Sequence, residues 1–453
     1  MINRRSAIAT CIFAATTAIS LAAQQPAAHA APASAHSTSL DLTVVKPESV
    51  GFSSERLERL HALIQDEIDH KQLAGAITLL ARHGKVVDFR TYGVRDIATG
   101  APMTRDTIFR DYSMTKPVTG VAMMVLYEEG KWLPSDPISK FAPEFAHLKV
   151  YNGKNADGKM ILADADHTPT VNELMSHTAG FSYDRFGLPE VGAIYREKQV
   201  MQSKNLQEMI DKVSTIPLNY QPGKGWMYSL SMDIEGYIVE KLSGQPLPDF
   251  MRDHIFTPLG MKDAGFYVPA DKRNRFATNY TWNAAQQQLV ANPTENGIPT
   301  DYVAQPTMPS GGGGLVSTVD DYYRFASMLA NGGTLNGKHI LAPSTVKLMS
   351  TNHVPEPVIN GTYGQFGIGL SQMRPGFGYG YNCAVMYDPP RASLTDGQGT
   401  FFWDGAAGTW FWVDPTNDIV FVGMIQRMSS PDNHPLEYKA HAAVYQALVD
   451  PSK

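Results

Sequence analysis

Strand-like sequence lies at the two ends of this chain, and a helix-rich middle separates them. Near the N-terminus, the apolar runs 76–81 and 86–92 are joined by Arg82-His83-Gly84-Lys85, a sequence typical of a β-hairpin. Near the C-terminus, strands are expected at residues 367–373, 400–403, 409–413 and 419–425. We expect these strands to join in an antiparallel sheet built from both ends of the chain.

Two helices are expected beside this sheet. Residues 53–71 follow a serine cap and place leucine and isoleucine side chains on one face, and residues 436–448 predict a closing helix. Between the ends, from about residue 113 to 324, helical sequence is interrupted by long loops rich in Pro, Gly and Asn. The sequence therefore predicts an α+β fold, an α/β sandwich whose sheet is flanked by terminal helices, with a helical lobe inserted.

The tetrapeptide Ser113-Met114-Thr115-Lys116 precedes the apolar run 118–127 and offers a nucleophile and its activator one helical turn apart. A serine hydroxyl is a weak nucleophile near neutral pH. A lysine amine held against it in a partly dry site can remove or relay its proton. Pro117 is compatible with a helix here only if it lies in the first turn.

A second copy of the S-x-x-K spacing occurs at Ser344-Thr345-Val346-Lys347. It follows Ala342-Pro343 and opens a segment that resembles a short helix capped by a serine. Ser113 instead follows a strand-like run and precedes a strongly apolar helix, where the helix dipole favours developing negative charge. We therefore interpret the copy at Ser344 as structural and Ser113 as the nucleophile.

Two further segments can complete a site. Residues 222–233 form a turn that leads into a helix, and Tyr228 in this turn can offer its hydroxyl to Ser113 and Lys116 as a proton relay. Residues 401–408 are a strand followed by small residues, Gly405-Ala406-Ala407-Gly408, where a substrate can approach the backbone closely.

These three segments, in this order, resemble the serine β-lactamase and penicillin-binding-protein superfamily, and within it the family VIII carboxylesterases. The segments His177-Thr178-Ala179-Gly180 and 312–318 also resemble landmark stretches of the superfamily. The resemblance implies a β-lactamase-like fold, with Ser113 as the acyl-accepting nucleophile and Lys116 and Tyr228 as general acid and base. It also implies an oxyanion hole made by the backbone N–H groups of Ser113 and Ala406.

The chain departs from the antibiotic-resistance enzymes at two places. Leu230 occupies the position of the asparagine in their Tyr-x-Asn triplet, and Trp403-Asp404-Gly405 replaces Lys-Thr-Gly. An acid near the site disfavours an anionic β-lactam and leaves a neutral ester unaffected. We therefore expect these three residues of the third motif to bind an uncharged ester, although Asp404 also departs from the Trp-Gly-Gly of the esterases.

The sequence thus predicts a serine hydrolase that cleaves carboxylic esters. The alternatives are a β-lactamase or D-alanyl carboxypeptidase or transpeptidase, and a catalytically silent binding protein, which the combined serine, lysine and tyrosine oppose. His177 belongs to a motif that is usually structural in this superfamily, so it is not assigned a catalytic role. No G-x-S-x-G nucleophile elbow is present, which argues against an α/β-hydrolase. No H-E-x-x-H or paired-cysteine site is present, so no metal is expected, and no cofactor is expected either.

The first thirty residues predict an export signal: Arg4-Arg5, an apolar stretch over 7–23, and Ala28-His29-Ala30 as the cleavage site. A flexible spacer over 31–45 and a hydrolase domain over 46–453 follow, and the protein is expected in the periplasm or outside the cell. Cys383 is the one cysteine outside the signal, so no disulfide is expected within the mature chain.

The charge of the chain limits the kinds of partner that it can bind. The formal net charge of −6 and the absence of basic runs argue against binding to nucleic acid or to an anionic membrane. No apolar stretch after the signal is long enough to span a bilayer, so no membrane insertion is expected after signal removal. A small-molecule ester is the expected partner, and the sequence does not specify an oligomeric state.

Overall fold

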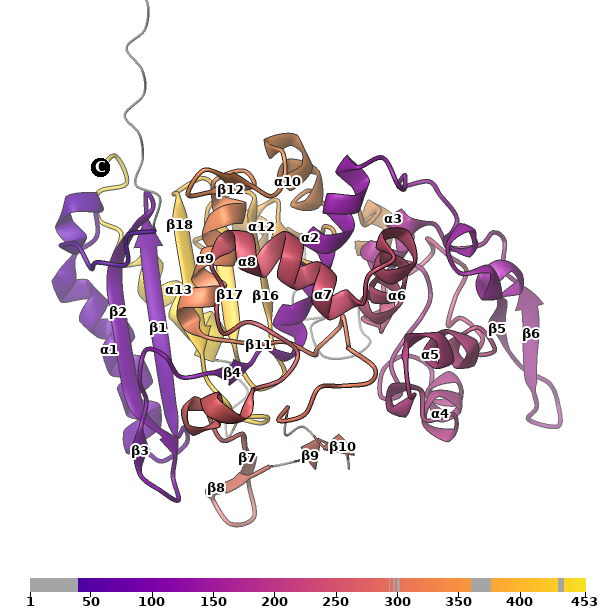
Figure 1. Cartoon of the computed structure of the whole chain (residues 1–453), viewed down its shortest axis with the longest axis horizontal. Coiled ribbons are helices and arrows are strands. Elements are labelled where there is room, and N and C mark those ends of the chain that lie inside the picture. Colours follow the sequence, from indigo (N-terminus) through magenta and orange to yellow (C-terminus); the bar gives the residue numbers. More distant parts are fainter. Residues whose placement is uncertain (1–39, 293, 296–297, 300–301, 360–375, 431–435) are drawn as a thin grey trace, which may run out of the picture. The chain divides into compact units, whose positions relative to one another are not determined.

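An eight-stranded antiparallel sheet joins the two ends of the chain in the computed structural model (Figure 1), as the sequence predicted. The structure describes residues 40–453 except 293, 296–297, 300–301, 360–375 and 431–435. The strand order is β14-β15-β16-β17-β18-β1-β2-β3, and β1 pairs with β18 along the register Ile77↔Met424 to Arg82↔Ile419. The N-terminal hairpin therefore continues the sheet that the C-terminal strands begin.

The strands of this sheet are β1 (Gly75–Arg82), β2 (Lys85–Asp96), β3 (Ala101–Pro102), β14 (Phe377–Tyr379), β15 (Ala384–Met386), β16 (Thr400–Asp404), β17 (Trp410–Asp414) and β18 (Ile419–Met424). Short two-stranded pairs are formed by β4 (Phe109–Arg110) with β11 (Val316–Ser317), β5 (Lys149–Lys154) with β6 (Met160–Asp164), β7 (Tyr280–Asn283) with β8 (Gln288–Ala291), β9 (Thr294–Glu295) with β10 (Ile298–Pro299), and β12 (Thr334–Leu335) with β13 (Lys338–His339). The expected strand at 367–373 lies outside the described residues, and β14 and β15 were not predicted.

The α-helices are α1 (Ser54–Asp69), α2 (Thr115–Glu128), α3 (Val171–Met175), α4 (Pro189–Glu197), α5 (Leu206–Val213), α6 (Ser231–Ser243), α7 (Leu247–Met251), α8 (Thr257–Leu259), α9 (Val319–Ala330), α10 (Pro343–Met349), α11 (Glu356–Ile359), α12 (Pro389–Ala392) and α13 (Leu436–Tyr445).

The predicted hairpin between β1 and β2 closes through a two-residue turn. His83 and Gly84 have φ values of 52° and 69°, and Arg82 pairs directly with Lys85. Two successive residues at positive φ give a turn whose twist matches that of the flanking strands, and glycine accepts this conformation without steric cost.

The two terminal helices pack together on one face of the sheet, as predicted. Ser53 caps α1 by accepting the Arg56 N–H, and Gln446 Nε2, just beyond α13, donates to the Arg56 carbonyl at 2.8 Å. The ring of His441 on α13 stacks on Trp412 of β17 at 3.8 Å between ring centroids. Successive strand residues face opposite sides, so Phe411 lies on the other face, where it contacts Tyr322 of α9.

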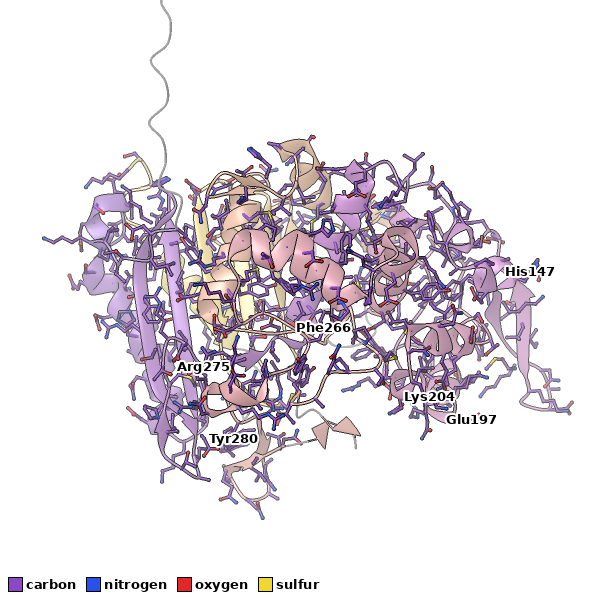
Figure 2. All side chains as sticks on the ribbon, in the orientation of Figure 1. His147, Glu197, Lys204, Phe266, Arg275 and Tyr280 are labelled. Carbon is purple, nitrogen blue, oxygen red and sulfur yellow. The ribbon has the colours of Figure 1, made fainter. Side chains whose placement is uncertain are left out.

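The helical lobe between the two parts of the sheet holds α2 to α8 (Figure 1). In Figure 2 the labelled His147, Glu197 and Lys204 belong to this lobe, and Arg275 and Tyr280 belong to the segment that returns toward the sheet. Helix α9 begins near the expected end of the lobe, at residue 319, and packs on the sheet. Of the expected spacer, the described residues 40–45 form neither helix nor strand.

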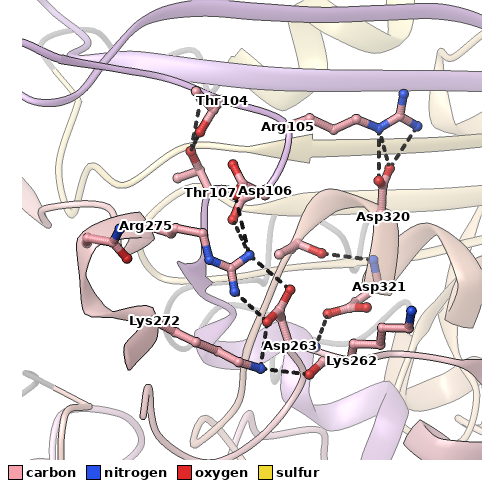
Figure 3. Close-up of polar contacts among 12 residues, drawn as sticks. Thr104, Arg105, Asp106, Thr107, Lys262, Asp263, Lys272, Arg275, Asp320 and Asp321 are labelled. Carbon is pink, nitrogen blue, oxygen red and sulfur yellow. Dashed lines mark hydrogen bonds and ion pairs between the residues drawn. The ribbon is translucent and has the colours of Figure 1, made fainter. Parts of the chain in front are cut away.

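A network of ion pairs anchors the segment that precedes the S-x-x-K motif (Figure 3). Arg105 pairs with Asp320 at the start of α9, with Nε 2.8 Å from Oδ2. Asp263 accepts from Arg275 at 2.6 Å and from Lys272 at 2.7 Å, and its own N–H donates to Asp321. These partly buried contacts hold the approach to β4 against α9.

Candidate active site

The segment that carries Ser113 is fixed by a short strand and a helix. Strand β4 pairs with β11, and a 3₁₀ turn over Tyr112–Met114 connects β4 to α2. Lys116 and Pro117 are the second and third residues of α2, so the proline lies in the first turn, as predicted. Ser113 is half-buried, whereas the Lys116 side chain is buried.

Tyr112, immediately before the nucleophile, has a φ of 46°, in the left-handed region that non-glycine residues seldom adopt. Such a conformation costs about 1 kcal/mol or more and persists where its surroundings enforce it. The Tyr112 hydroxyl accepts a hydrogen bond from Asn279, and its ring packs edge-on against Tyr302 at 6.0 Å. Both contacts hold the backbone bend that presents Ser113.

The three residues predicted to be catalytic meet at one oxygen atom. Lys116 Nζ lies 3.1 Å from Ser113 Oγ, and the Tyr228 hydroxyl donates to the same Oγ at 2.7 Å. Lys116 Nζ also lies 4.6 Å from the centre of the Tyr228 ring. The structure thus brings together Ser113 from the 3₁₀ turn, Lys116 from α2 and Tyr228 from the turn before α6.

Lys116 is held by a backbone carbonyl from a distant loop. Its Nζ donates to the Gly312 oxygen at 2.6 Å. Burial lowers the pKa of Lys116 to about 7, although the acids Asp233, Asp404 and Glu235 act in the opposite direction. Burial thus favours the neutral amine, and a neutral amine can accept the Ser113 proton.

Asp233 supports this arrangement and was not singled out by the sequence analysis. It is buried in the first turn of α6, accepts from Ser310 Oγ at 2.5 Å and accepts from the Gly312 N–H at 3.2 Å. These bonds fix the loop that presents the Gly312 carbonyl to Lys116. The glycine run 311–314 can be seen in the sequence, but no local pattern shows that Asp233 accepts a hydrogen bond from it.

Tyr228 stays a neutral phenol in this site. Burial raises its pKa well above the ordinary range, and the bond to Ser113 opposes that rise only in part. A protonated hydroxyl 2.7 Å from Ser113 Oγ can donate a proton but does not supply a phenolate base at neutral pH. The geometry therefore favours Lys116 as the base and Tyr228 as the acid or relay.

The turn after β16 presents the N–H expected in the oxyanion hole. The Gly408 N–H donates to the Gly405 carbonyl at 2.8 Å, which makes a β-turn with the exposed Ala406 at its second position. The hydrogen bond that closes such a turn does not involve the N–H of the second residue, which here is Ala406. Thr409 Oγ1 donates to the carbonyl of Asp111, which ties this turn to the segment that carries Ser113.

Trp403 and Asp404, predicted to bind substrate, leave β16 on opposite faces. The Trp403 ring is buried and packs against Tyr228 at 5.5 Å. The Asp404 side chain lies on the face where Phe402 meets His441 of α13, and burial raises the pKa of its carboxyl to about 6. Asp404 still acts electrostatically on Lys116 and Tyr228.

Gly405 has no room for a side chain. A Cβ at this position would overlap Thr409 Oγ1 and the carbonyl oxygen of Asp111. This close backbone approach sets the spacing between the turn and the nucleophile segment.

Two half-buried aromatic residues extend the apolar surface beside the nucleophile. The rings of Tyr183 and Phe186 lie 5.7 Å and 5.8 Å from the Tyr228 ring, and the Tyr183 ring centre lies 5.6 Å from Lys116 Nζ. They were not predicted, because they lie in a loop, where residues follow no helix or strand period.

His177 is a packing residue in this structure. Its Nδ1 is 3.0 Å from Ser229 Oγ, and its ring contacts Tyr228, Trp226 and Tyr379. Burial lowers its pKa well below the ordinary value, so the imidazole is neutral.

The second S-x-x-K copy lies on the surface. Ser344 and Lys347 are both exposed on α10. The helix begins at Pro343 with Ala342 at the cap position, so the expected serine cap was wrong. Proline fits the first helical position because its missing N–H has no partner there.

The described part of the chain contains no group of three or more metal-ligating side chains and no helix long and apolar enough to span a bilayer.

The family model described as Beta-lactamase matches residues 60–446. The chain belongs to the Beta-lactamase family. It is 30% identical over 391 residues to Esterase EstB of Burkholderia gladioli, covering 82% of this chain and 90% of that relative. It is 25% identical over 413 residues to a putative D-alanyl-D-alanine carboxypeptidase of Escherichia coli K12, covering 86% of both.

Among solved structures, the chain is similar to EstCE1, described as a hydrolase with promiscuous acyltransferase activity. The TM-score is 0.71 at 27% identity, and the match covers 86% of this chain and 99% of the other. These relatives place the protein among the serine hydrolases of the β-lactamase and penicillin-binding-protein superfamily, with affinity to the family VIII carboxylesterases.

Proposed function

We propose that the protein cleaves carboxylic esters through an acyl-enzyme on Ser113. The observation that carries the proposal is the convergence of Lys116 Nζ and the Tyr228 hydroxyl on Ser113 Oγ, with the pKa of Lys116 near 7. EstB and EstCE1, named as an esterase and a hydrolase, support the ester as the substrate class.

In the first half-reaction, neutral Lys116 takes the proton of the Ser113 hydroxyl while Oγ forms a bond to the ester carbonyl carbon. The carbonyl oxygen becomes an oxyanion, which the N–H groups of Ser113 and Ala406 stabilise. When the C–O bond to the alcohol breaks, Tyr228 gives its proton to the leaving oxygen and regains one from Lys116. Water then forms a bond to the acyl carbon and gives one proton to Lys116. The bond between the acyl carbon and Ser113 Oγ breaks, Oγ takes that proton back from Lys116, and the carboxylic acid leaves.

A fluorophosphonate probe tests the nucleophile. We expect its mass on the peptide that contains Ser113, no labelling of Ser113→Ala, and unchanged labelling of Ser344→Ala. Ser344 is the matched control because it has the same S-x-x-K spacing on an exposed helix. Stoichiometric labelling of Ser113→Ala at another residue would contradict the proposal.

We further propose that uncharged esters with short acyl groups are the preferred substrates. Asp404 adds negative charge near Lys116, and the half-buried Tyr183 and Phe186 rings offer an apolar surface near the nucleophile. Wild-type protein should hydrolyse p-nitrophenyl acetate or butyrate faster than nitrocefin. Asp404→Thr should improve handling of carboxylate-bearing substrates by up to about 1–3 kcal/mol, the scale of a screened charge pair.

The second candidate function is that of a D-alanyl carboxypeptidase or β-lactamase, which the Escherichia coli relative favours. Leu230 and Trp403 oppose it, because they stand where such enzymes use an asparagine and a lysine. Faster hydrolysis of penicillins or D-alanyl peptides than of the p-nitrophenyl esters would favour this candidate.

Export is also proposed. The signal-like residues 1–30, which lie outside the described residues, motivate it. N-terminal sequencing of periplasmic or secreted protein should begin at or near Ala31. A functional pool that retains Met1 in the cytoplasm would contradict export.

A further inference from the structure

A buried glutamine contacts the segment that leads to the nucleophile. Gln426 lies just beyond the end of β18, and its side chain is buried. Its amide oxygen accepts a hydrogen bond from the Arg110 N–H at 3.1 Å, and its amide nitrogen donates to the Arg110 carbonyl at 3.0 Å. Arg110 is the last residue of β4, and the 3₁₀ turn with Ser113 follows it closely.

The amide of Gln426 takes the place of a neighbouring strand. On its other edge β4 pairs with β11, and the Asp111 N–H donates to the Leu315 carbonyl. Neighbouring residues of a strand direct their backbone groups to opposite edges, so those of Arg110 face away from β11. A buried backbone group without a partner costs free energy, and a side-chain amide offers the same donor and acceptor as a peptide group. Gln426 therefore pairs with the outer edge of β4 as a strand would.

Further contacts fix the orientation of this amide. Its nitrogen also donates to the Ile425 carbonyl at 2.9 Å, and its oxygen lies 3.3 Å from Arg110 Nη1. The backbone is held as well, because the Gln426 carbonyl accepts from the Tyr280 N–H at 3.1 Å. Both amide N–H bonds thus face carbonyl oxygens and the amide oxygen faces N–H groups, so the reversed orientation would break every one of these side-chain bonds.

The next residue reaches the turn that carries the second oxyanion donor. The Arg427 N–H donates to the Ala407 carbonyl at 2.8 Å, and Ala407 directly follows Ala406. The Arg427 side chain is buried, pairs with Glu67 of α1 at 2.6 Å and donates to the Gln72 carbonyl at 2.7 Å. These contacts anchor the backbone of Arg427 to α1 and to the loop after it.

We propose that Gln426 is a positioning residue for the proposed esterase, whose amide fixes the Ser113 N–H relative to the Ala406 N–H. The proposal rests on the proposed function. Through its side chain Gln426 holds the strand before Ser113, and through the adjoining Arg427 N–H it is joined to the turn at Ala406. Two donors stabilise an oxyanion only when both lie within hydrogen-bond distance of it, so a small displacement of either one lowers the rate.

The test uses a ligand that occupies the oxyanion hole. Propyl trifluoromethyl ketone is uncharged and forms a hemiketal with a nucleophilic serine, and the hemiketal oxygen mimics the oxyanion of the transition state. Gln426→Leu removes all the amide bonds at similar side-chain size. We expect the Ki of the ketone to rise by about 10–10²-fold and kcat/KM for p-nitrophenyl butyrate to fall by a similar factor. Partial unfolding alone would lower the number of active molecules and leave Ki unchanged.

Gln221 provides the matched control, because its amide makes the same two-point contact with a backbone elsewhere. It accepts from the Asp166 N–H at 2.7 Å and donates to the Asp164 carbonyl at 3.0 Å, at the end of β6. Gln221→Leu should leave Ki unchanged. Gln426→Asn keeps an amide that is one methylene too short to reach Arg110, so it should also raise Ki. Melting curves check folding, and Gln426→Asn decides the question if Gln426→Leu does not fold.

A wild-type Ki in folded Gln426→Leu or Gln426→Asn would overturn the proposal. An equal rise of Ki in Gln221→Leu would do the same, because the effect would then not be specific to the link between the two donors. Failure of the proposed function has a different signature: Ser113→Ala would then bind the ketone as tightly as wild type and would keep its esterase activity.

Discussion

At the scale of single residues, the proposed chemistry depends on one nitrogen and one oxygen next to Ser113 Oγ. Lys116 reaches it at 3.1 Å and Tyr228 at 2.7 Å, and both side chains are buried. Burial acts on the two groups in opposite directions, because it lowers the pKa of Lys116 and raises that of Tyr228. Desolvation thus makes the amine a base and keeps the phenol protonated.

Because Lys116 and Tyr228 pass the same proton, we expect the effects of their substitutions on kcat to be far from additive. Lys116→Ala and Tyr228→Phe should each lower kcat for p-nitrophenyl butyrate by roughly 10²–10⁴-fold, the usual size of an acid or base contribution. The kcat of the double variant should be only slightly lower than that of the less active single variant, as for other residues that act as a unit. Steady-state kinetics of the three variants measures this, and fully multiplicative losses would show independent roles.

At the scale of elements, the turn after β16 aligns the proposed oxyanion N–H of Ala406 with the nucleophile segment. Two contacts set the alignment: the Thr409 hydroxyl on the Asp111 carbonyl at 3.1 Å, and the close backbone approach at Gly405. A turn can hold an N–H in place only if the chain beneath it cannot shift.

Gly405→Ala should displace this turn, because the added methyl group overlaps Thr409 Oγ1 and the Asp111 carbonyl oxygen. We expect kcat to fall by about 10²-fold or more, the cost of losing one oxyanion donor. Gly265→Ala is the matched control, since a Cβ there meets nothing closer than the Tyr267 oxygen at 3.8 Å. Equal activity of the two variants, both folded by circular dichroism, would remove the turn from the mechanism.

At the scale of the whole molecule, several buried acids keep their protons to a higher pH than they would in the unfolded chain. Burial raises the pKa of Asp111 and of Glu235 to about 8, and that of Asp321 to about 6. The folded protein then keeps protons that the unfolded chain releases at lower pH. A group of this kind contributes stability below its unfolded pKa, and the contribution is lost as the pH rises through the folded pKa.

Glu235 offers a clean test of this linkage. Its Oε2 accepts from Asn382 at 2.6 Å, a bond that glutamine can keep. Wild-type protein loses the stabilising contribution of the Glu235 proton as the pH rises from 4.5 to about 8, whereas glutamine does not titrate. The melting temperature of Glu235→Gln should therefore rise relative to that of wild type over this pH range. We expect a gain of about 2–4 °C, measured by calorimetry at pH 5 and pH 8.5. Exposed Glu55→Gln should show no such trend, and a trend of opposite sign would contradict the assignment.

Local patterns in the sequence determined the elements on which this protein is built. The turn at His83-Gly84, the serine cap of α1 and the apolar runs of β16 to β18 are short-range signals, and the structure confirms each of them. The spacing of Ser113 and Lys116 is local in the same sense, because residues i and i+3 meet on any helix. The strands β14 and β15 were missed because three-residue strands have too few positions to show a period.

Only the tertiary structure decided what these residues can do. The pKa of Lys116 falls toward neutral because distant segments bury the amine, and the Gly312 carbonyl, held by Asp233, fixes its position. Side-chain pKa values follow from desolvation and from charges brought close in space, which the order of residues along a chain does not show.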